Sequence, residues 1–287
     1  MKNVVKWRWF LAIIVFMTLS GIVNVPAVGA AGLLQASPWK TLHASRVRLI
    51  PGPLLGSGDR LVGVQVQLDP GWHTYWRNPG YSGVPPRFDW SESTNLEKIF
   101  TEWPAPVGLP DAFGVSIGYQ DEVVFPVRLA FHDPSKSASI SLQFDYAVCA
   151  EVCVPLRAEL LMNISGEASA PQDTLATVNR YRRLVPDRLN KFGKNAPTII
   201  RSWVSGKAAP VTLYIEAKVE PPAEVFVEGP SAYFFSPAKA QRGGATEVVV
   251  FEVNVDGIAS ADNLIGETVN ATMVSAAGSL ELSWTVH

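Results

Sequence analysis

Alternating apolar and polar positions dominate the first half of the chain. Residues 61–68 place an apolar side chain at every second position, which is the period of a half-buried β-strand. The turn residues Asp-Pro-Gly at 69–71 end this strand. Similar runs predict three more strands, over residues 123–131, 140–146 and 157–164. Pro126 predicts a sheet edge or a bulge, because proline cannot donate to a ladder.

The centre of the chain has a different period. Apolar residues at nearly helical spacing over residues 173–192 predict a connecting helix, which residues 168–171 precede as a linker. Gln172 or Asp173 is expected to cap this helix, and Pro186 to kink or split it. Alternation returns after Pro197, with strands expected over residues 211–217, 225–228, 247–255 and 280–286.

This pattern predicts an all-β protein of antiparallel sandwiches, because short strands are separated by turn residues. We expect a first sandwich over residues 31–168, a helical linker over 169–196 and a second, smaller β-sandwich without cysteines over 197–287.

Residues 1–30 have the layout of a secretory signal peptide. Lys2, Lys6 and Arg8 precede the uncharged, mostly apolar run 9–25, and small residues follow, with cleavage expected after Ala30. An uncleaved membrane anchor is the alternative, because the run is at the short edge of what a spanning helix needs. Export predicts a periplasmic location, where a disulfide can persist.

Charge excludes one class of partner. The chain has 24 Lys and Arg against 26 Asp and Glu, a formal charge of −2, and loss of the three cations in residues 1–30 makes it −5. A mildly acidic chain without basic clusters is not expected to bind nucleic acid.

Cys149 and Cys153 are the only cysteines, four positions apart within predicted β-structure. In an extended strand such residues lie ~13 Å apart, whereas a disulfide needs Cα atoms within ~7 Å. A bond between them therefore requires a chain reversal. Residues 150–152 would form the loop of a hairpin or a single helical turn that Pro155 ends, and the hairpin fits the flanking strands better.

The residues leave three roles open for this pair. As a structural link, a five-residue ring contributes only about 2 kcal/mol. As a redox pair, a short ring suits an exposed bond that is easily reduced. Metal binding has the least support: zinc needs four ligands and copper(I) favours Cys and Met. None of the histidines His43, His73 and His132 lies near the cysteines in sequence, and the only methionines outside the predicted signal peptide are Met162 and Met273.

A redox pair also needs a movable apolar cover. The segment 109–116, with Phe113 beside Gly114, is a candidate, and ordinary core packing of Phe113 is the alternative. No Gly-x-Ser-x-Gly elbow, phosphate loop or dinucleotide motif occurs, so we expect no cofactor.

Four blocks carry a family resemblance: GWHTYWRNPG at 71–80, GVPPRFDW at 83–90, LPDAFGVSIGYQDEVVFPV at 109–127 and DYAVCAEVCVP at 145–155. In this order they resemble the N-terminal periplasmic domain of the thiol:disulfide interchange protein DsbD and its relatives, including the suppressor-of-copper-sensitivity branch. The resemblance covers roughly residues 40–165.

The resemblance implies an immunoglobulin-like sandwich with one redox-active cysteine pair on a hairpin. Cys149 and Cys153 would be that pair, with Cys153 attacked in the mixed disulfide. Electrons would come from a thioredoxin-like domain fed by a membrane transporter. They would pass to periplasmic oxidoreductases such as isomerases or cytochrome c maturation proteins.

By the same resemblance, Asp111 and Phe113 match the cap loop, and Tyr119 and Tyr146 match aromatic positions near the site. There are departures: the cysteine spacing is shorter, Val-Pro-Leu follows at 154–156, and Ala112 replaces an acidic residue. The family protein continues into membrane helices and a thioredoxin-like domain, so we expect a separate electron donor here or another role.

The sequence therefore predicts a periplasmic module that exchanges thiols and disulfides with protein partners. The alternative is a non-catalytic immunoglobulin-like binding or assembly module with a structural disulfide.

Overall fold

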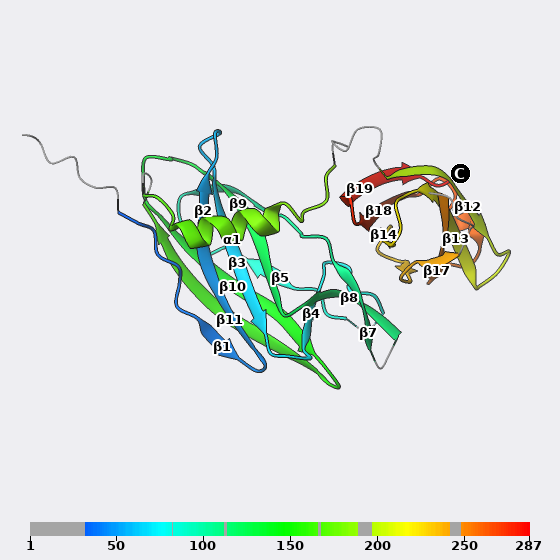
Figure 1. Ribbon diagram of the computed structural model, residues 1–287, viewed down its shortest axis with the longest axis horizontal. Coiled ribbons are helices and arrows are strands. Elements are labelled where there is room, and N and C mark those ends of the chain that lie inside the picture. The colour runs from blue at the N-terminus through cyan, green and yellow to red at the C-terminus, as the bar shows by residue number, and fades with distance from the viewer. Residues whose placement is uncertain (1–31, 82, 112–113, 166–167, 189–196, 242–247) are drawn as a thin grey trace, which may run out of the picture. The chain divides into compact units, whose positions relative to one another are not determined.

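The computed structural model describes residues 32–287 except 82, 112–113, 166–167, 189–196 and 242–247 (Figure 1). The predicted signal peptide lies outside the described residues. Within them, no helix has the length and apolar character that a membrane span requires.

The first part of the chain forms two antiparallel sheets. The five-stranded sheet has the order β1-β2-β3-β9-β6. Its strands are β1 (Lys40–Leu42), β2 (Ser45–Leu54), β3 (Arg60–Leu68), β6 (Leu96–Thr101) and β9 (Glu122–Phe131).

The six-stranded sheet has the order β11-β10-β4-β8-β7, with β5 pairing β10. Its strands are β4 (His73–Tyr75), β5 (Arg87–Asp89), β7 (Val107–Asp111), β8 (Gly114–Gln120), β10 (Ala138–Cys149) and β11 (Cys153–Ile164).

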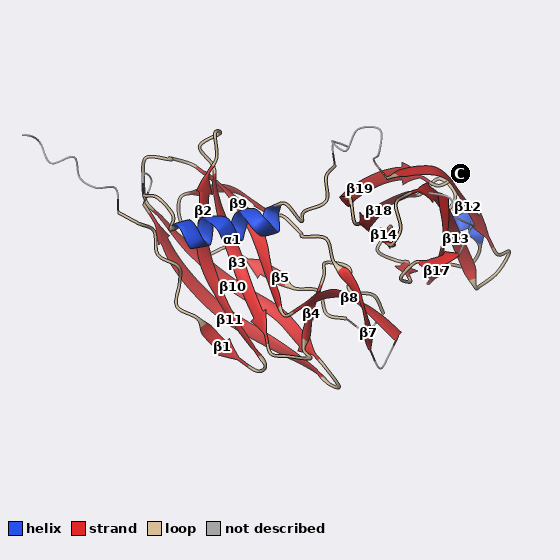
Figure 2. Cartoon of the chain, in the orientation of Figure 1, coloured by secondary structure: helices blue, strands red, loops and turns tan. Residues whose placement is uncertain are grey.

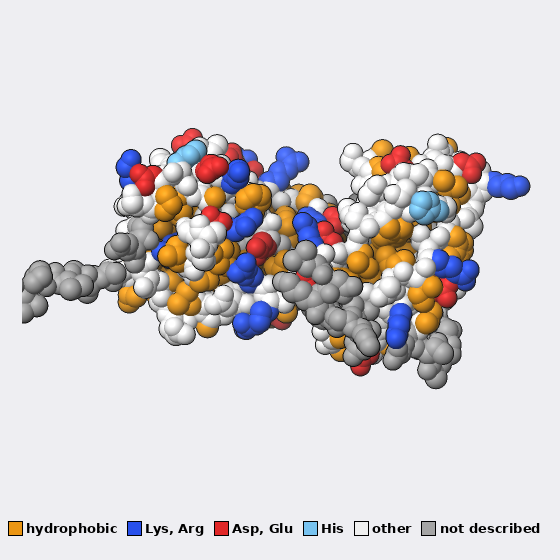
Figure 3. All heavy atoms as spheres, turned by 90° about the horizontal axis from the view of Figure 1, so that it is seen from above, with side chains coloured by type: hydrophobic (Ala, Val, Ile, Leu, Met, Phe, Trp, Pro, Cys, Tyr) orange, Lys and Arg blue, Asp and Glu red, His pale blue; other side chains and the backbone are white. Residues whose placement is uncertain are grey.

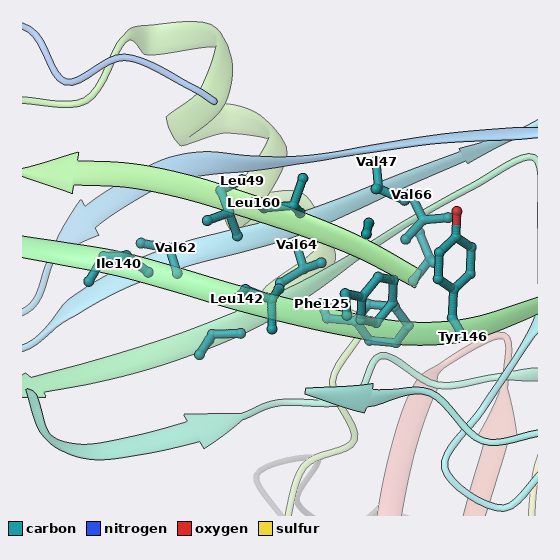
Figure 4. Packing of buried hydrophobic residues seen from close by; sticks show 14 of the residues in the cluster. Val47, Leu49, Val62, Val64, Val66, Phe125, Ile140, Leu142, Tyr146 and Leu160 are labelled. Atoms are coloured by element: carbon teal, nitrogen blue, oxygen red, sulfur yellow. The ribbon is translucent and has the colours of Figure 1, made fainter. Parts of the chain in front are cut away.

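Side chains from both sheets fill one core. Figure 4 shows Val47, Val64 and Phe125 of one sheet among Ile140 and Leu142 of the other, and all five are buried. Because alternate residues of a strand point to opposite faces, the apolar set of each strand faces this core. The predicted sandwich is confirmed.

Strand β3 differs from the half-buried strand that its alternation predicted, since nearly all its residues are buried. The cause is helix α1 (Gln172–Arg182), which lies across the outer face of the sheet (Figure 1). Val178 of this helix is fully buried against Ile50 and Leu61.

The expected helix cap was wrong. Pro171 occupies the N-cap position and no side chain caps the helix there. The Pro171 carbonyl instead accepts hydrogen bonds from the Leu175 backbone N–H at 3.0 Å and from Thr174 Oγ1 at 3.0 Å. The helix ends at Arg182, so Pro186 neither kinks nor splits it.

Pro126 lies neither on an edge strand nor at a bulge in β9, because β9 pairs β3 on one side and β6 on the other. Its carbonyl accepts the N–H of Glu102 at 2.7 Å, just beyond the end of β6. Since the N and C=O of a strand residue point to the same side, the missing N–H faces the place where β6 stops. No ladder donor is lost there.

The second part of the chain is also antiparallel. One sheet contains β12 (Thr198–Ser205), β13 (Val211–Lys218), β15 (Phe234–Phe235), β16 (Lys239–Gln241) and β17 (Val248–Asp256). The other contains β14 (Ala223–Glu228), β18 (Thr268–Ser275) and β19 (Gly278–Thr285), and a 3-10 helix, η2, spans Ala261–Asn263. Strands thus dominate the described residues, as the all-β prediction requires (Figure 2). The exact domain boundaries stay a prediction.

The charged surface is mixed. On the face in Figure 3, acidic and basic side chains lie interspersed, with apolar side chains between them. This face offers no basic stripe of the kind that follows a nucleic-acid backbone.

The contact between the helix and the sheet depends on Gly63. A Cβ at Gly63 would lie 2.6 Å from Val124 Cγ1 and 3.1 Å from Val178 Cγ2. We expect Gly63→Ala to lower the free energy of unfolding by about 1–3 kcal/mol through overpacking. Urea denaturation measures this change. Gly56→Ala is the matched control, since a Cβ there meets nothing within 4 Å; equal losses in both variants would contradict this packing.

Candidate redox site

The two cysteines close a long hairpin. Strands β10 and β11 pair in register from Ala138 opposite Ile164 to Cys149 opposite Cys153. Residues 150–152 are the connecting loop, and the two Cα atoms lie 4.1 Å apart across a disulfide. The predicted hairpin is confirmed, and the alternative of a single helical turn is excluded.

The two sulfur-bearing residues differ in exposure. Cys149 lies on β10, which pairs both β11 and β4 at this level, and the residue is only 3% exposed. Cys153 begins β11, the outermost strand of the sheet, and is exposed beside Val152, which is 63% exposed. A partner approaching from solvent therefore meets Cys153 first.

The disulfide lies on the outer face of the sheet, away from the core. Cys149, Ala147 and Tyr75 form a small buried cluster separate from the main core. Val148, between them in sequence, belongs to the main core, as strand alternation requires. The reactive bond and the sandwich core are thus on opposite sides of one sheet.

Strand β4 supplies two side chains to the disulfide. His73 is the cross-strand neighbour of Cys149 and is buried. Its ring meets that of Tyr75 edge-on, with centroids 5.3 Å apart. The Tyr75 hydroxyl oxygen lies 3.2 Å from Cys153 Sγ. Neither residue was expected at the redox site from sequence, where His73 was considered only as a candidate metal ligand.

Tyr119 and Tyr146 belong to the main core, on the face of the sheet opposite the sulfurs, and their role as aromatic residues near the site stays a prediction. Figure 4 shows Tyr146 among these buried side chains. Its hydroxyl is 2.7 Å from Ser45 Oγ, whereas Tyr119 donates to the Pro104 carbonyl at 2.8 Å. Burial raises the pKa of Tyr146 to about 12 and that of Tyr119 well above its ordinary value, so both stay protonated.

The expected cap segment, residues 109–116, includes parts of two paired strands rather than a loop alone. Strands β7 and β8 form a hairpin in which Asp111 pairs Gly114. Gly114 lies six residues along β8 from Gln120, the residue opposite His73. The ladder by itself does not bring Asp111 to the disulfide. Phe113 lies outside the described residues, and the cap role of both residues stays a prediction.

A groove of about 400 Å³ lies beside the hairpin. Pro155, two residues from Cys153, contributes to it, and Arg157 forms an ion pair with Asp145 at 2.5 Å. The lining comprises Val84, Pro85, Arg87, Asp145, Tyr146, Pro155, Leu156 and Arg157.

The described residues offer little to a metal. Among them, no three His, Cys, Asp or Glu side chains gather in a way that could hold an ion. The site brings together the two sulfurs, the Tyr75 hydroxyl and the ring of His73.

The fold is an immunoglobulin-like sandwich whose outer hairpin carries a disulfide between a buried cysteine, Cys149, and an exposed one, Cys153. Residues 53–164 match the family described as thiol:disulfide interchange protein DsbD, N-terminal, which confirms the predicted resemblance over this segment. The chain is also similar to the crystal structure of the N-terminal periplasmic domain of ScsB from Proteus mirabilis. The identity is 21% and the TM-score 0.69, over 88% of this chain and 98% of that one, which establishes the shared fold. No curated protein matches the chain.

The disulfide adds little to the stability of the hairpin, because the ladder and the core already hold β10 and β11 together. We expect reduction to lower the free energy of unfolding by no more than about 2 kcal/mol, the value for a five-residue ring. Chemical denaturation with and without a reductant measures this difference. The double variant Cys149→Ala/Cys153→Ala serves as the control that reductant cannot change. Loss of the folded state on reduction would contradict this expectation.

Proposed function

We propose that this chain is a periplasmic thiol–disulfide exchange module, which takes electrons from a thioredoxin-like protein or a separate membrane transporter. It passes them to periplasmic oxidoreductases, including isomerases and proteins of cytochrome c maturation or copper stress. The observation that carries the proposal is the unequal exposure of the two bonded cysteines on an outer hairpin. The family match over residues 53–164 and the periplasmic relative support it.

The exchange proceeds by two thiolate attacks. A donor thiolate attacks the exposed Sγ of Cys153, the bond between Cys149 and Cys153 breaks, and its electron pair goes to Cys149 Sγ. A second donor thiolate then attacks the donor sulfur of the mixed disulfide. The donor leaves as a disulfide, and the module holds two reduced cysteines. The reverse sequence, starting from Cys153 thiolate, reduces a substrate disulfide.

A structural disulfide in a non-catalytic binding module is the competing reading. A shuttle requires a reduction potential within the range of known carriers, about −180 to −270 mV, whereas an inert structural bond falls below about −300 mV. We expect the first range. Equilibration of the full chain against glutathione and dithiol buffers measures the potential, and a value below about −300 mV would favour the structural alternative.

The assignment of Cys153 as the attacked sulfur has its own test. In single-cysteine variants, oxidised glutathione should form a mixed disulfide with Cys153 in Cys149→Ala at least about tenfold faster than with Cys149 in Cys153→Ala, because access limits thiol exchange. Mass spectrometry follows the adduct over time. Equal rates in the two variants would overturn the order of attack, whatever the reduction potential is.

A further inference from the structure

The hydroxyl group of Tyr75 contacts a reacting atom. Its oxygen lies 3.2 Å from Cys153 Sγ, within hydrogen-bond distance for sulfur. A disulfide sulfur carries no hydrogen, so the tyrosine must be the donor in this contact. Its acceptor is the sulfur of Cys153, the exposed one of the two cysteines.

The Tyr75 ring is held in place on several sides. The residue is fully buried, and its ring packs with Ala147 and Cys149. The edge of the ring meets His73. A Cβ at Gly83 would lie 2.7 Å from Tyr75 Cδ1, so the loop that contains Gly83 also closes on this ring. A donor fixed in this way needs no reorganisation when charge appears on the sulfur.

We infer that Tyr75 is a catalytic hydrogen-bond donor that stabilises the thiolate of Cys153, which is the leaving sulfur when the mixed disulfide is resolved and the attacking sulfur toward a substrate disulfide. This inference rests on the proposed function. When the donor protein departs as a disulfide, the electron pair of the broken mixed disulfide goes to Cys153 Sγ, which accepts the Tyr75 hydrogen bond. The same thiolate then attacks a substrate disulfide, and Tyr75 keeps its proton throughout.

The neighbouring cysteine has the opposite environment. Cys149 lies buried in an apolar cluster, and such a position disfavours a charged sulfur. Among the described residues, the other titratable groups at this end of the hairpin are His73, opposite Cys149, Glu151 in the connecting loop, and the paired Asp145 and Arg157 further along the same face. Of the contacts described at this site, the one from Tyr75 reaches the Cys153 sulfur directly.

The test measures the pH profile of Cys153 alkylation by iodoacetamide in the full chain with Cys149→Ala. Adding Tyr75→Phe should raise the pKa of the Cys153 thiol. Below that pKa the reaction should become about tenfold slower, because a hydrogen bond to a charged group is lost. At high pH the rate should be equal or faster, since a more basic thiolate is intrinsically more nucleophilic. A purely structural role for the ring would not shift the pH midpoint.

Tyr119→Phe in the same background is the matched control. It also removes a buried hydroxyl, but one that bonds to the Pro104 carbonyl on the core face, so the midpoint should stay in place. If Tyr75→Phe does not fold, as thermal unfolding would show, Gly83→Ala is the second variant. Its Cβ would lie 2.2 Å from Pro79 Cβ and 2.7 Å from Tyr75 Cδ1, so it presses on the ring from the loop side and should raise the midpoint in the same direction.

An unchanged midpoint in the folded Tyr75→Phe variant, or an equal shift in Tyr119→Phe, would overturn the role of Tyr75. The proposed function is judged separately, by the reduction potential of the unsubstituted chain. A potential in the carrier range with an unchanged midpoint would refute the donor and leave the exchange module intact.

Discussion

The in-register pairing of β10 with β11 is the constraint on which the site depends. Side chains alternate between the two faces of a strand, so this register sends Ile140, Leu142 and Phe144 into the core. The same register sends Cys149 and Cys153 to the outer face, directly opposite one another. A slip of one residue would bury the cysteines among core side chains and expose the apolar set. The core therefore fixes the position of a disulfide that it does not touch.

Local features of this hairpin could be predicted from sequence. The alternation over residues 140–146 identifies the strand, and the four-residue spacing of the cysteines demands a reversal. The orientation of Tyr146 was available in the same pattern, because it precedes Cys149 by three residues and must point to the other face. The resemblance implied a role for Tyr146 near the site, whereas strand geometry shows only that its side chain is on the opposite face of the sheet.

The residues that lie beside the disulfide could not be predicted from sequence, because they come from a strand that is distant along the chain. His73 and Tyr75 reach the disulfide only because β4 inserts between β10 and β8, and Cys149 lies far along the chain from both. Nothing in the segment Gly-Trp-His-Thr-Tyr-Trp indicates which distant strand will be its neighbour. Residues 61–68 show the same limit: their pattern predicts a half-buried strand, and the packing of α1 on the outer face explains why nearly all of β3 is buried.

The placement of the reactive bond on an outer strand has an evolutionary consequence. Substitutions in the main core change the melting behaviour of the sandwich on the face away from the sulfurs, while substitutions at His73 or Tyr75 change the surroundings of the sulfurs on the other face. The stability of the sandwich and the reduction potential of the disulfide can thus change separately during evolution. A lineage could therefore change the surroundings of this disulfide while it inherits the sandwich unaltered.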